Sequence, residues 1–243
     1  MDQLKGRILE TDALADYQKN QLFELMSMYF DGMVRDNFDK DLEDKSLVII
    51  LEDSHGKIQG FSTIMLLDEI VEGIPIKAVF SGDTIIHKNY WGERELMRTF
   101  GQFILSLIQR YPQTKLYWFL ISMGYKTYRF LPVFFKEFYP RYNKPTPEFE
   151  KRVLDALGHK KYPLEYDSQT GVIHFTKSKE YLKPGVADIT DERLKNPHIR
   201  FFLHQNPLYI KGDELACLTE LSKGNLKSTA YRVITLQKKE GTK

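Results

Sequence analysis

The chain has 243 residues, which suits one large domain or a core domain with an added segment. Lys and Arg number 35 and Asp and Glu 33, and these charges are interspersed, without the basic stripe of a nucleic-acid-binding protein. The single cysteine, Cys217, excludes an intramolecular disulfide and a multi-cysteine metal site. We therefore expect a globular protein from a reducing compartment, with no nucleic-acid partner.

The N-terminal sequence "MDQLKGRILETD" is charged and lacks the apolar run of a signal peptide. No stretch of the chain approaches the roughly 20 apolar residues of a membrane span. The six histidines do not have the spacing of metal ligands. These features predict a cytoplasmic protein with no transmembrane segment and no metal site.

The first half of the chain has clear periodic patterns. Apolar residues recur at helical spacing from a predicted N-cap at Asp12 to a predicted stop at Gly32. Three strands joined by short turns follow, and then a helix with one apolar stripe and a buried central strand. The strands are predicted at 46–53, 58–71 and 76–87, the helix at 95–111 and the central strand at 116–122.

The second half is less regular. Its predicted elements are a short aromatic helix at 130–140, a helix reached through a Pro-rich link and ended by Gly158, a strand at 171–177, two short helices around Pro197 and a strand at 213–221.

This order of elements predicts the fold class α+β, with a mostly antiparallel sheet flanked by helices. We expect two parts. Residues 1–142 form the core, and residues 143–243 form a C-terminal α/β extension that completes the sheet and a substrate pocket.

Aromatic residues are unusually frequent, with 16 Phe, 14 Tyr and 2 Trp, and many of them lie between Tyr111 and Tyr142. One interpretation is an aromatic core, which is the commoner use of such residues. The other is a wide apolar pocket or tunnel for a large hydrophobic group. Composition leaves both open.

The stretch "SGDTIIHKNYWGERELMRTF", residues 81–100, reads as a strand, a polar turn and the start of a helix. A helix start presents unpaired N–H groups and a positive dipole end, so such junctions often bind phosphate. This junction has one glycine in its turn, Gly92, where phosphate-binding loops usually have two or three.

A helix that follows directly on the third long strand, within an order of elements running from about Leu14 to Tyr142, resembles the GNAT superfamily of N-acyltransferases. Family members commonly read V-x-V-x-P-x-Y-R-G-x-G-x-G across this turn, and "IIHKNYWGERELM" keeps the hydrophobic pair, the Tyr and the first Gly. The resemblance implies that backbone amides of the turn hold the pyrophosphate of coenzyme A, while the preceding strand pairs with pantetheine. It assigns donor contacts to Ile85, Ile86, His87, Trp91, Gly92, Glu93, Arg94 and Glu95.

The turn departs from the family pattern at Trp91, where Arg or Gln is usual, and at Arg94 and Leu96, where glycines are usual. Side chains there restrict the approach of a phosphate, although the Arg94 guanidinium can itself meet one. Three interpretations stay open. The chain binds acyl-CoA with altered contacts, or it takes its acyl group from an acyl carrier protein, or it is a non-catalytic GNAT-shaped binding or regulatory module. A looser resemblance to the long-chain N-acyl amino acid synthases fits the interpretation in which an acyl carrier protein supplies the acyl group.

Acyl transfer to an amine requires a polarised carbonyl and a proton donor for the departing thiolate. The resemblance places the polarising N–H among the amides of Ile85 to His87. It places the acid on a Tyr after the fifth strand, where Tyr128 is preferred, while Tyr125 is assigned to substrate binding. A packed ring with a hydrogen-bonded hydroxyl is the commoner role for a Tyr in so aromatic a segment.

The ammonium of the acceptor must also lose a proton. Asp83 and His87 lie near the end of the third strand with the same side-chain parity, and both are candidates for this base. Ser122, at the end of the central strand, is assigned to pantetheine or substrate.

The sequence therefore predicts an acyltransferase with no tightly bound cofactor. Its co-substrate is acyl-CoA or a phosphopantetheine-linked acyl group, and its acceptor is an amine on a small molecule, peptide or lipid precursor. The prediction requires neighbouring strands to separate just before Trp91.

Overall fold

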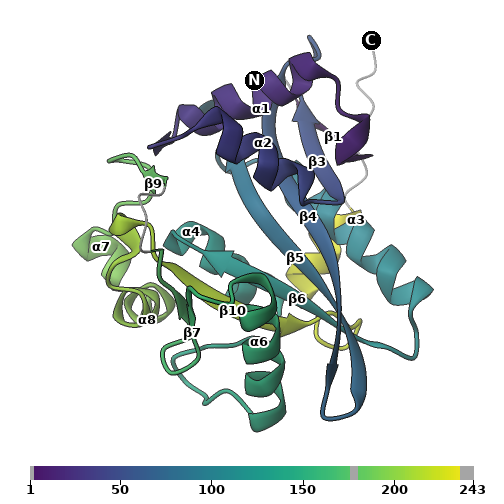
Figure 1. Ribbon diagram of the computed structural model, residues 1–243, viewed down its shortest axis with the longest axis vertical. Coiled ribbons are helices and arrows are strands. Elements are labelled where there is room, and N and C mark those ends of the chain that lie inside the picture. The colour runs from purple at the N-terminus through teal and green to yellow at the C-terminus, as the bar shows by residue number, and fades with distance from the viewer. Residues whose placement is uncertain (1–2, 176–179, 236–243) are drawn as a thin grey trace.

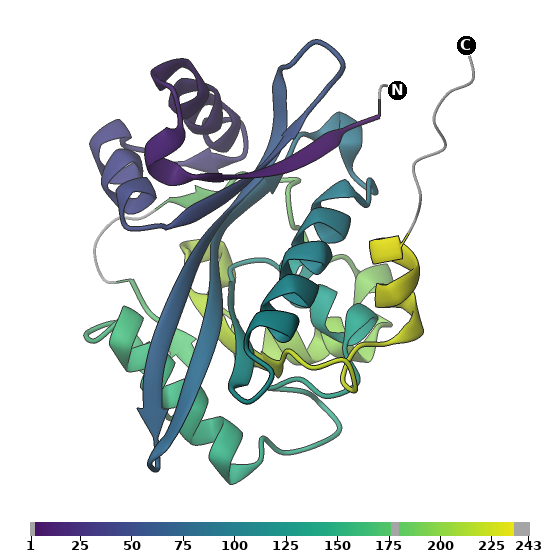
Figure 2. The same cartoon turned by 90° about the vertical axis from the view of Figure 1, so that its right-hand side faces the viewer.

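The computed structural model describes residues 3–175 and 180–235. They form an eight-stranded sheet in the order β1-β3-β4-β5-β6-β10-β8-β7, with helices on both faces (Figures 1 and 2). All its neighbouring pairs are antiparallel except β5–β6. The strands are β1 (Lys5–Glu10), β3 (Leu47–Glu52), β4 (Ile58–Val71), β5 (Ile74–Ile86), β6 (Lys115–Ser122), β7 (Tyr166–Asp167), β8 (Val172–Ile173) and β10 (Glu214–Glu220). The predicted α+β class with a mostly antiparallel sheet is confirmed.

The helices divide between the two faces of the sheet. One face is covered by α3, α5, α8 and α9 over one continuous apolar core. The other face has two separate apolar clusters, one under α1 and α2 and one under α6. The helices are α1 (Asp16–Ser27), α2 (Arg35–Glu43), α3 (Glu95–Arg110), α4 (Tyr125–Tyr128), α5 (Phe130–Phe134), α6 (Glu148–Lys161), α7 (Asp191–Leu194), α8 (Pro197–Gln205) and α9 (Ser228–Thr235). A separate two-stranded sheet pairs β2 (Phe30–Asp31) with β9 (Tyr181–Leu182).

The strongly periodic elements lie where the sequence predicts them. The three-strand meander is β3, β4 and β5, the long helix is α3 and the central strand is β6. The two short helices around Pro197 are α7 and α8, and Pro197 occupies the first turn of α8, where its missing N–H costs nothing. The strand at the C-terminal side is β10.

Four predicted elements have different boundaries in the structure. The first helix begins at Asp16, because Asp12 lies in a 3₁₀ turn, and it ends at Ser27. The predicted aromatic helix at 130–140 ends at Phe134. Helix α6 continues through Gly158, which is glycine because a Cβ there would lie 2.7 Å from the ring of Tyr166. Among its described residues, the strand predicted at 171–177 pairs only at Val172–Ile173, and its last two residues, 176 and 177, lie outside the described part of the chain. Strand β1 and helix α9 were not predicted.

Strand β10 lies between β6 and β8, so residues on both sides of position 142 share one sheet. The predicted boundary at residue 142 stays a prediction. Within the described ranges 3–175 and 180–235, no helix is both long and apolar enough to cross a membrane.

The start of α3 is fixed to the edge of the sheet by a buried carboxylate. Glu95 is only 6% exposed, and its Oε1 accepts the backbone N–H of Gly6 in β1 at 2.8 Å. The Arg98 guanidinium donates to both oxygens of the same carboxylate at 2.7 and 2.8 Å. A Cβ on Gly6 would lie 2.1 Å from Thr99 Oγ1, so the helix and the strand approach closely. The N-terminus of α3 is therefore held in one place relative to the sheet.

We expect Glu95→Ala to lower the free energy of unfolding by about 2 kcal/mol, because it leaves the partly buried Arg98 guanidinium and the Gly6 N–H without their acceptor. Urea denaturation measures the change. The matched control is Glu93→Ala, which removes an exposed carboxylate from the same turn. Equal effects of the two substitutions would show that Glu95 does not anchor the helix.

Candidate functional site

Strands β5 and β6 separate before β5 ends. They pair in parallel from Ile76 and Lys115 to Ser81 and Leu120. Beyond Ser81, β5 continues to Ile86 and stays paired with β4 alone. Residues 82–86 therefore have one strand edge that β6 does not cover, and the predicted separation of strands before Trp91 is confirmed.

A β-bulge lies at the point of separation. Ser62 pairs with Thr84 and Ile64 with Ser81, so Thr63 of β4 faces the two residues Gly82 and Asp83 of β5. The extra residue changes the alternation of side chains, and Ser81 and Thr84 consequently point to the same face, that of α3. A Cβ on Gly82 would lie 2.7 Å from Thr63 Oγ1 and 2.9 Å from Lys45 Cε, so the bulge leaves no room for a side chain there.

A pocket lies behind this bulge on the α3 face, and we call it the strand-gap pocket. About 310 Å³ of space lies between its walls when the gaps among the lining atoms and the solvent at its mouth are counted, so it is a narrow recess and not a wide cavity. One wall is polar and is formed by the hydroxyls of Ser62, Ser81 and Thr84, and we call it the hydroxyl wall. The Ser62 and Thr84 hydroxyls are 2.7 Å apart, and Trp118 Nε1 donates to Ser81 Oγ at 2.8 Å. The lining residues are Ser62, Ser81, Thr84, Leu96, Met97, Phe100, Trp118, Leu120, Thr127 and Phe130.

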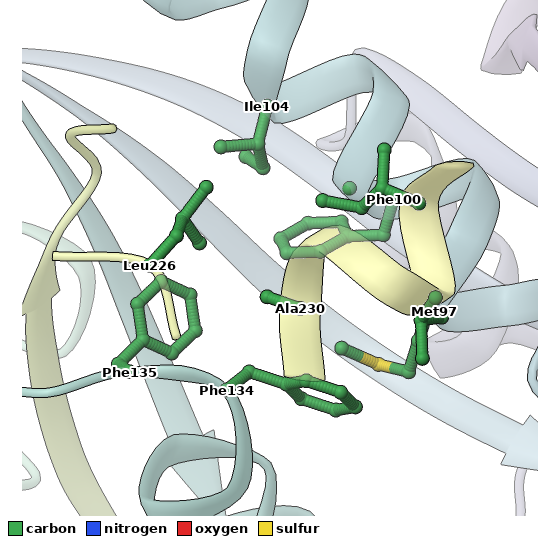
Figure 3. Close-up of a pocket in the computed structure, with 10 residues that line it drawn as sticks. Met97, Phe100, Ile104, Phe134, Phe135, Leu226 and Ala230 are labelled. Carbon is green, nitrogen blue, oxygen red and sulfur yellow. The ribbon is translucent and has the colours of Figure 1, made fainter. Parts of the chain in front are cut away.

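A second pocket lies further along α3, between that helix, α5 and α9, and we call it the α9 pocket (Figure 3). About 350 Å³ of space lies between its walls when the gaps among the lining atoms and the solvent on its open side are counted, so it is a narrow apolar groove. Met97 and Phe100 line both pockets. The lining residues of the α9 pocket are Met97, Phe100, Gly101, Ile104, Phe134, Phe135, Leu226, Ala230, Val233 and Ile234.

The indole of Trp91 occupies the uncovered edge of β5. The His87 N–H donates to Gln59 O of β4 at 2.8 Å, and backbone groups of a strand alternate between its two edges, so the Ile86 N–H and C=O face away from β4. Trp91 Nε1 donates to this Ile86 carbonyl at 2.9 Å. Lys126 Nζ of α4 lies 3.6 Å from the centroid of the Trp91 ring, and burial lowers the pKa of Lys126. Trp91 thus links the end of β5 to the helix that follows β6.

The turn before α3 already uses part of its hydrogen-bonding capacity. The amides of Trp91 and Glu93 donate to the carbonyls of Lys88 and Tyr90 at 3.2 and 3.0 Å. Gly92 has a φ of 100°, in the left-handed region that favours glycine. Arg94 precedes the first residue of α3 and is exposed, so its guanidinium is accessible to an anion.

Three predicted site residues make structural contacts. Tyr128 is fully buried, its hydroxyl donates to Pro140 O at 2.9 Å, and burial raises the pKa of that hydroxyl. Tyr125 is also buried, and neither tyrosine belongs to the lining of the two pockets. Ser122 is 1% exposed, and its hydroxyl donates to Gly124 O at 2.8 Å.

The two predicted bases have different surroundings. The bulge puts Asp83 on the face opposite Ser81 and Thr84, which is the α6 face. There its charge acts on Lys161 and Tyr162. Burial lowers the pKa of Lys161 and raises the pKa of Tyr162. His87 lies beyond the end of β5, where its Nδ1 accepts the Asn89 N–H at 3.3 Å. Burial and then the charges of Lys88 and Lys57 lower the pKa of His87.

A polar strip on the α6 face separates the α1/α2 cluster from the α6 cluster. Lys45 is 3% exposed, and its Nζ donates to Asp41 Oδ2 at 2.5 Å. The ammonium groups of Lys45 and Lys161 lie 5.9 and 5.7 Å from the centroid of the Phe80 ring. The buried Thr63 Oγ1 has no hydrogen-bond partner among the described residues. The bulge therefore has a polar surface on each face of the sheet.

The sequence interpretation missed the hydroxyl wall and the two lysines. Ser62, Ser81 and Thr84 are polar residues within otherwise apolar strands, and this interruption was the signal available. Lys45 lies in the link between α2 and β3, and Lys161 is the last residue of α6. Lysines in such positions usually face solvent, so the sequence gave no signal that they lie on the polar strip. Among the residues that the structure describes, no group of three or more His, Cys, Asp and Glu is placed to hold a metal ion.

No family model matches the chain, and no curated protein matches it. Solved structures resemble part of it. A probable N-acyltransferase from Enterococcus faecalis V583 aligns with 13% identity and a TM-score of 0.41 over 54% of this chain and 33% of its own. The Escherichia coli GNAT family N-acetyltransferase YhbS, solved with CoA, gives 11% identity and a TM-score of 0.38 over 55% of this chain and 69% of its own. Saccharomyces cerevisiae N-myristoyltransferase with bound myristoyl-CoA gives 11% identity and a TM-score of 0.38 over 51% of this chain and 30% of its own. The aligned part is thus about half of this chain and a third of the Enterococcus protein.

We expect Tyr128→Phe to lower the free energy of unfolding by about 1 kcal/mol, because the Pro140 carbonyl loses its donor in a buried site. The matched control is Tyr142→Phe, which removes a hydroxyl from a half-exposed ring. Urea denaturation of both variants tests the assignment. A Tyr128→Phe protein as stable as the control would contradict it.

Proposed function

We propose that the chain is a GNAT-type acyltransferase that moves an acyl group from a phosphopantetheine thioester to an amine. The observation that carries the proposal is the separation of β5 from β6 at a bulge, with a pocket directly behind it. The uncovered edge of residues 82–86 offers backbone N–H and C=O groups to a linear amide-containing molecule. Pantetheine has two amides, so it suits this edge.

The donor enters along β5 from the start of α3. Its phosphate end meets the exposed Arg94 and the N-terminus of α3, a 16-residue helix whose dipole favours an anion. Its pantetheine arm runs beside residues 82–86, and the Trp91 indole must first release the Ile86 carbonyl. The thioester then lies at the hydroxyl wall of the strand-gap pocket. This route agrees with the donor contacts that the sequence predicts for Ile86, Trp91 and Arg94.

The Ile86 N–H is the proposed donor to an amide carbonyl of the pantetheine arm. It faces the uncovered edge, whereas the neighbouring His87 N–H is already bonded to Gln59 O. The thioester lies further along β5, at the hydroxyl wall. The prediction that an amide among Ile85 to His87 polarises the thioester carbonyl stays a prediction.

The acceptor amine approaches from the α6 face, where Asp83 lies in the bulge. The Asp83 carboxylate accepts a proton from the ammonium, and the neutral amine then attacks the carbonyl carbon. As the C–S bond of the tetrahedral intermediate breaks, its nitrogen loses a second proton, and that proton passes to the departing thiolate. Lys45 and Lys161 lie on this face and set the charge around the acceptor.

The acid for the thiolate is open to test. Tyr128 would have to break its bond to Pro140 and leave a fully buried position, so we propose that it supports the fold and that turnover survives its loss. Turnover of Tyr128→Phe within threefold of the parent is the expected result. A loss of 100-fold or more with unchanged donor binding would restore Tyr128 as the acid.

The proposed function predicts that coenzyme A binds and stabilises the protein. At a CoA concentration 100-fold above Kd, the free energy of unfolding should increase by about 2.7 kcal/mol, and a rise in Tm reports this increase. Binding should also change the fluorescence of Trp91, because pantetheine displaces its indole from Ile86. Trp91→Phe removes that signal and serves as the control. A protein whose Tm responds neither to CoA nor to acyl-pantetheine would be a non-catalytic module, the rival interpretation.

A further inference from the structure

We propose that the α9 pocket receives the far end of an acyl chain whose thioester lies at the strand gap. The donor is then a phosphopantetheine thioester with a chain much longer than acetyl. This inference rests on the proposed function and names the class of donor that the site takes.

The two pockets are adjacent compartments with common walls. Met97 and Phe100 line both of them. Phe100 also packs against Trp118 of the strand-gap pocket with ring centroids 4.7 Å apart, and Trp118 packs against Phe135 of the α9 pocket at 5.8 Å. A chain that starts at the hydroxyl wall meets an unbroken aromatic surface from the first pocket to the second.

A second aromatic contact joins the pockets on the α5 side. Phe130 lines the strand-gap pocket, Phe134 lines the α9 pocket, and their rings stack with centroids 6.3 Å apart. Met97 stands where the pockets meet, and its unbranched side chain adjusts to a neighbouring chain more readily than a branched one. The boundary between the two pockets is thus formed by apolar side chains, and the proposed alkyl chain crosses it beside Met97.

The lining of the α9 pocket selects for such a chain. Every lining residue is apolar, and Figure 3 shows Met97, Phe100, Phe134, Phe135 and Leu226 around Ala230. A polar ligand would lose its hydration there without gaining hydrogen bonds from side chains. An alkyl chain gains free energy with each methylene that leaves water.

Helix α9 forms the outer wall of the pocket and is fixed in place by hydrogen bonds to the segment at α5. The Lys227 N–H donates to Phe134 O at 2.9 Å, Lys227 Nζ to Pro132 O at 2.7 Å and Thr229 Oγ1 to Val133 O at 2.7 Å. On its other side α9 lies directly on α3, since a Cβ on Gly101 would come within 2.4 Å of Ile234 Cγ1 (Figure 2). The α9 pocket thus lies between two helices with different anchors, since α9 is hydrogen-bonded to the segment at α5 and the start of α3 is hydrogen-bonded to β1.

The test is a chain-length series measured by titration calorimetry on the full chain, from CoA and acetyl-CoA to octanoyl- and dodecanoyl-CoA. We expect Kd to fall about two- to fourfold for each added methylene until the pocket is full, so that octanoyl-CoA binds at least 50-fold more tightly than acetyl-CoA. Dodecanoyl-pantetheine, which lacks the nucleotide, is run in parallel. Tight binding of that compound without binding of CoA identifies a carrier-type donor and supports the inference.

Ala230→Phe fills the α9 pocket. It should abolish the increase in affinity that octanoyl and dodecanoyl chains give over acetyl, while CoA and acetyl-CoA bind as they do to the parent. The matched control is Ala156→Phe in α6, on the opposite face of the sheet, which should keep the dependence on chain length. Far-UV circular dichroism and Tm establish that both variants fold.

The outcomes separate the two proposals. If CoA and acetyl-CoA bind but the parent shows no dependence on chain length, the inference is wrong and the proposed function stands. If Ala230→Phe folds and keeps the parent's dependence, the chain lies elsewhere and the inference is also wrong. If neither any acyl-CoA nor dodecanoyl-pantetheine binds, the proposed function fails first. If Ala230→Phe does not fold, the series on the parent decides alone.

Discussion

The site depends on one irregularity in the sheet, the bulge in which Gly82 and Asp83 face the single residue Thr63. Pairing between β5 and β6 stops at this point, and the change of alternation puts Ser81 and Thr84 on one face and Asp83 on the other. A regular strand would have put Asp83, not Thr84, on the α3 face beside Ser81. The bulge therefore lies at the opening in the sheet and puts the proposed donor and acceptor surfaces on opposite faces.

The apolar clusters are distributed differently on the two faces of the sheet. The α3 face has one continuous core, so the strand-gap pocket and the α9 pocket are gaps within an apolar layer. The α6 face has two clusters with a polar strip between them, formed by Thr63, Lys45 and Lys161. The two faces of the opening are thus apolar on one side and polar on the other, and this difference is the basis on which we propose an acyl donor on the α3 face and an amine acceptor on the α6 face.

The sequence predicted the meander, α3 and β6, because these segments have long and consistent apolar periodicity. It could not predict the bulge, because the two-for-one pairing at Thr63 depends on how β4 and β5 meet and leaves no local pattern beyond Gly82. The sequence assigned Tyr128 as the acid because it follows the fifth strand. In the structure its ring is buried against Phe138 and against Phe202 of α8. Phe138 lies outside regular structure and α8 lies far along the chain, so the sequence around Tyr128 did not indicate this burial. Helix α9 was missed because its eight residues are too short for a periodic pattern to be distinctive, although it completes the pocket.

Amide hydrogen exchange along β5 tests the central claim most directly, because it reports on the strand edge itself. With a saturating acyl-pantetheine donor, exchange should slow within residues 82–86, above all at Ile86, and stay unchanged at residues 76–81, which β6 already covers. Protection that appears elsewhere in the chain while residues 82–86 exchange as in the free protein would show that no thioester binds in the opening between β5 and β6.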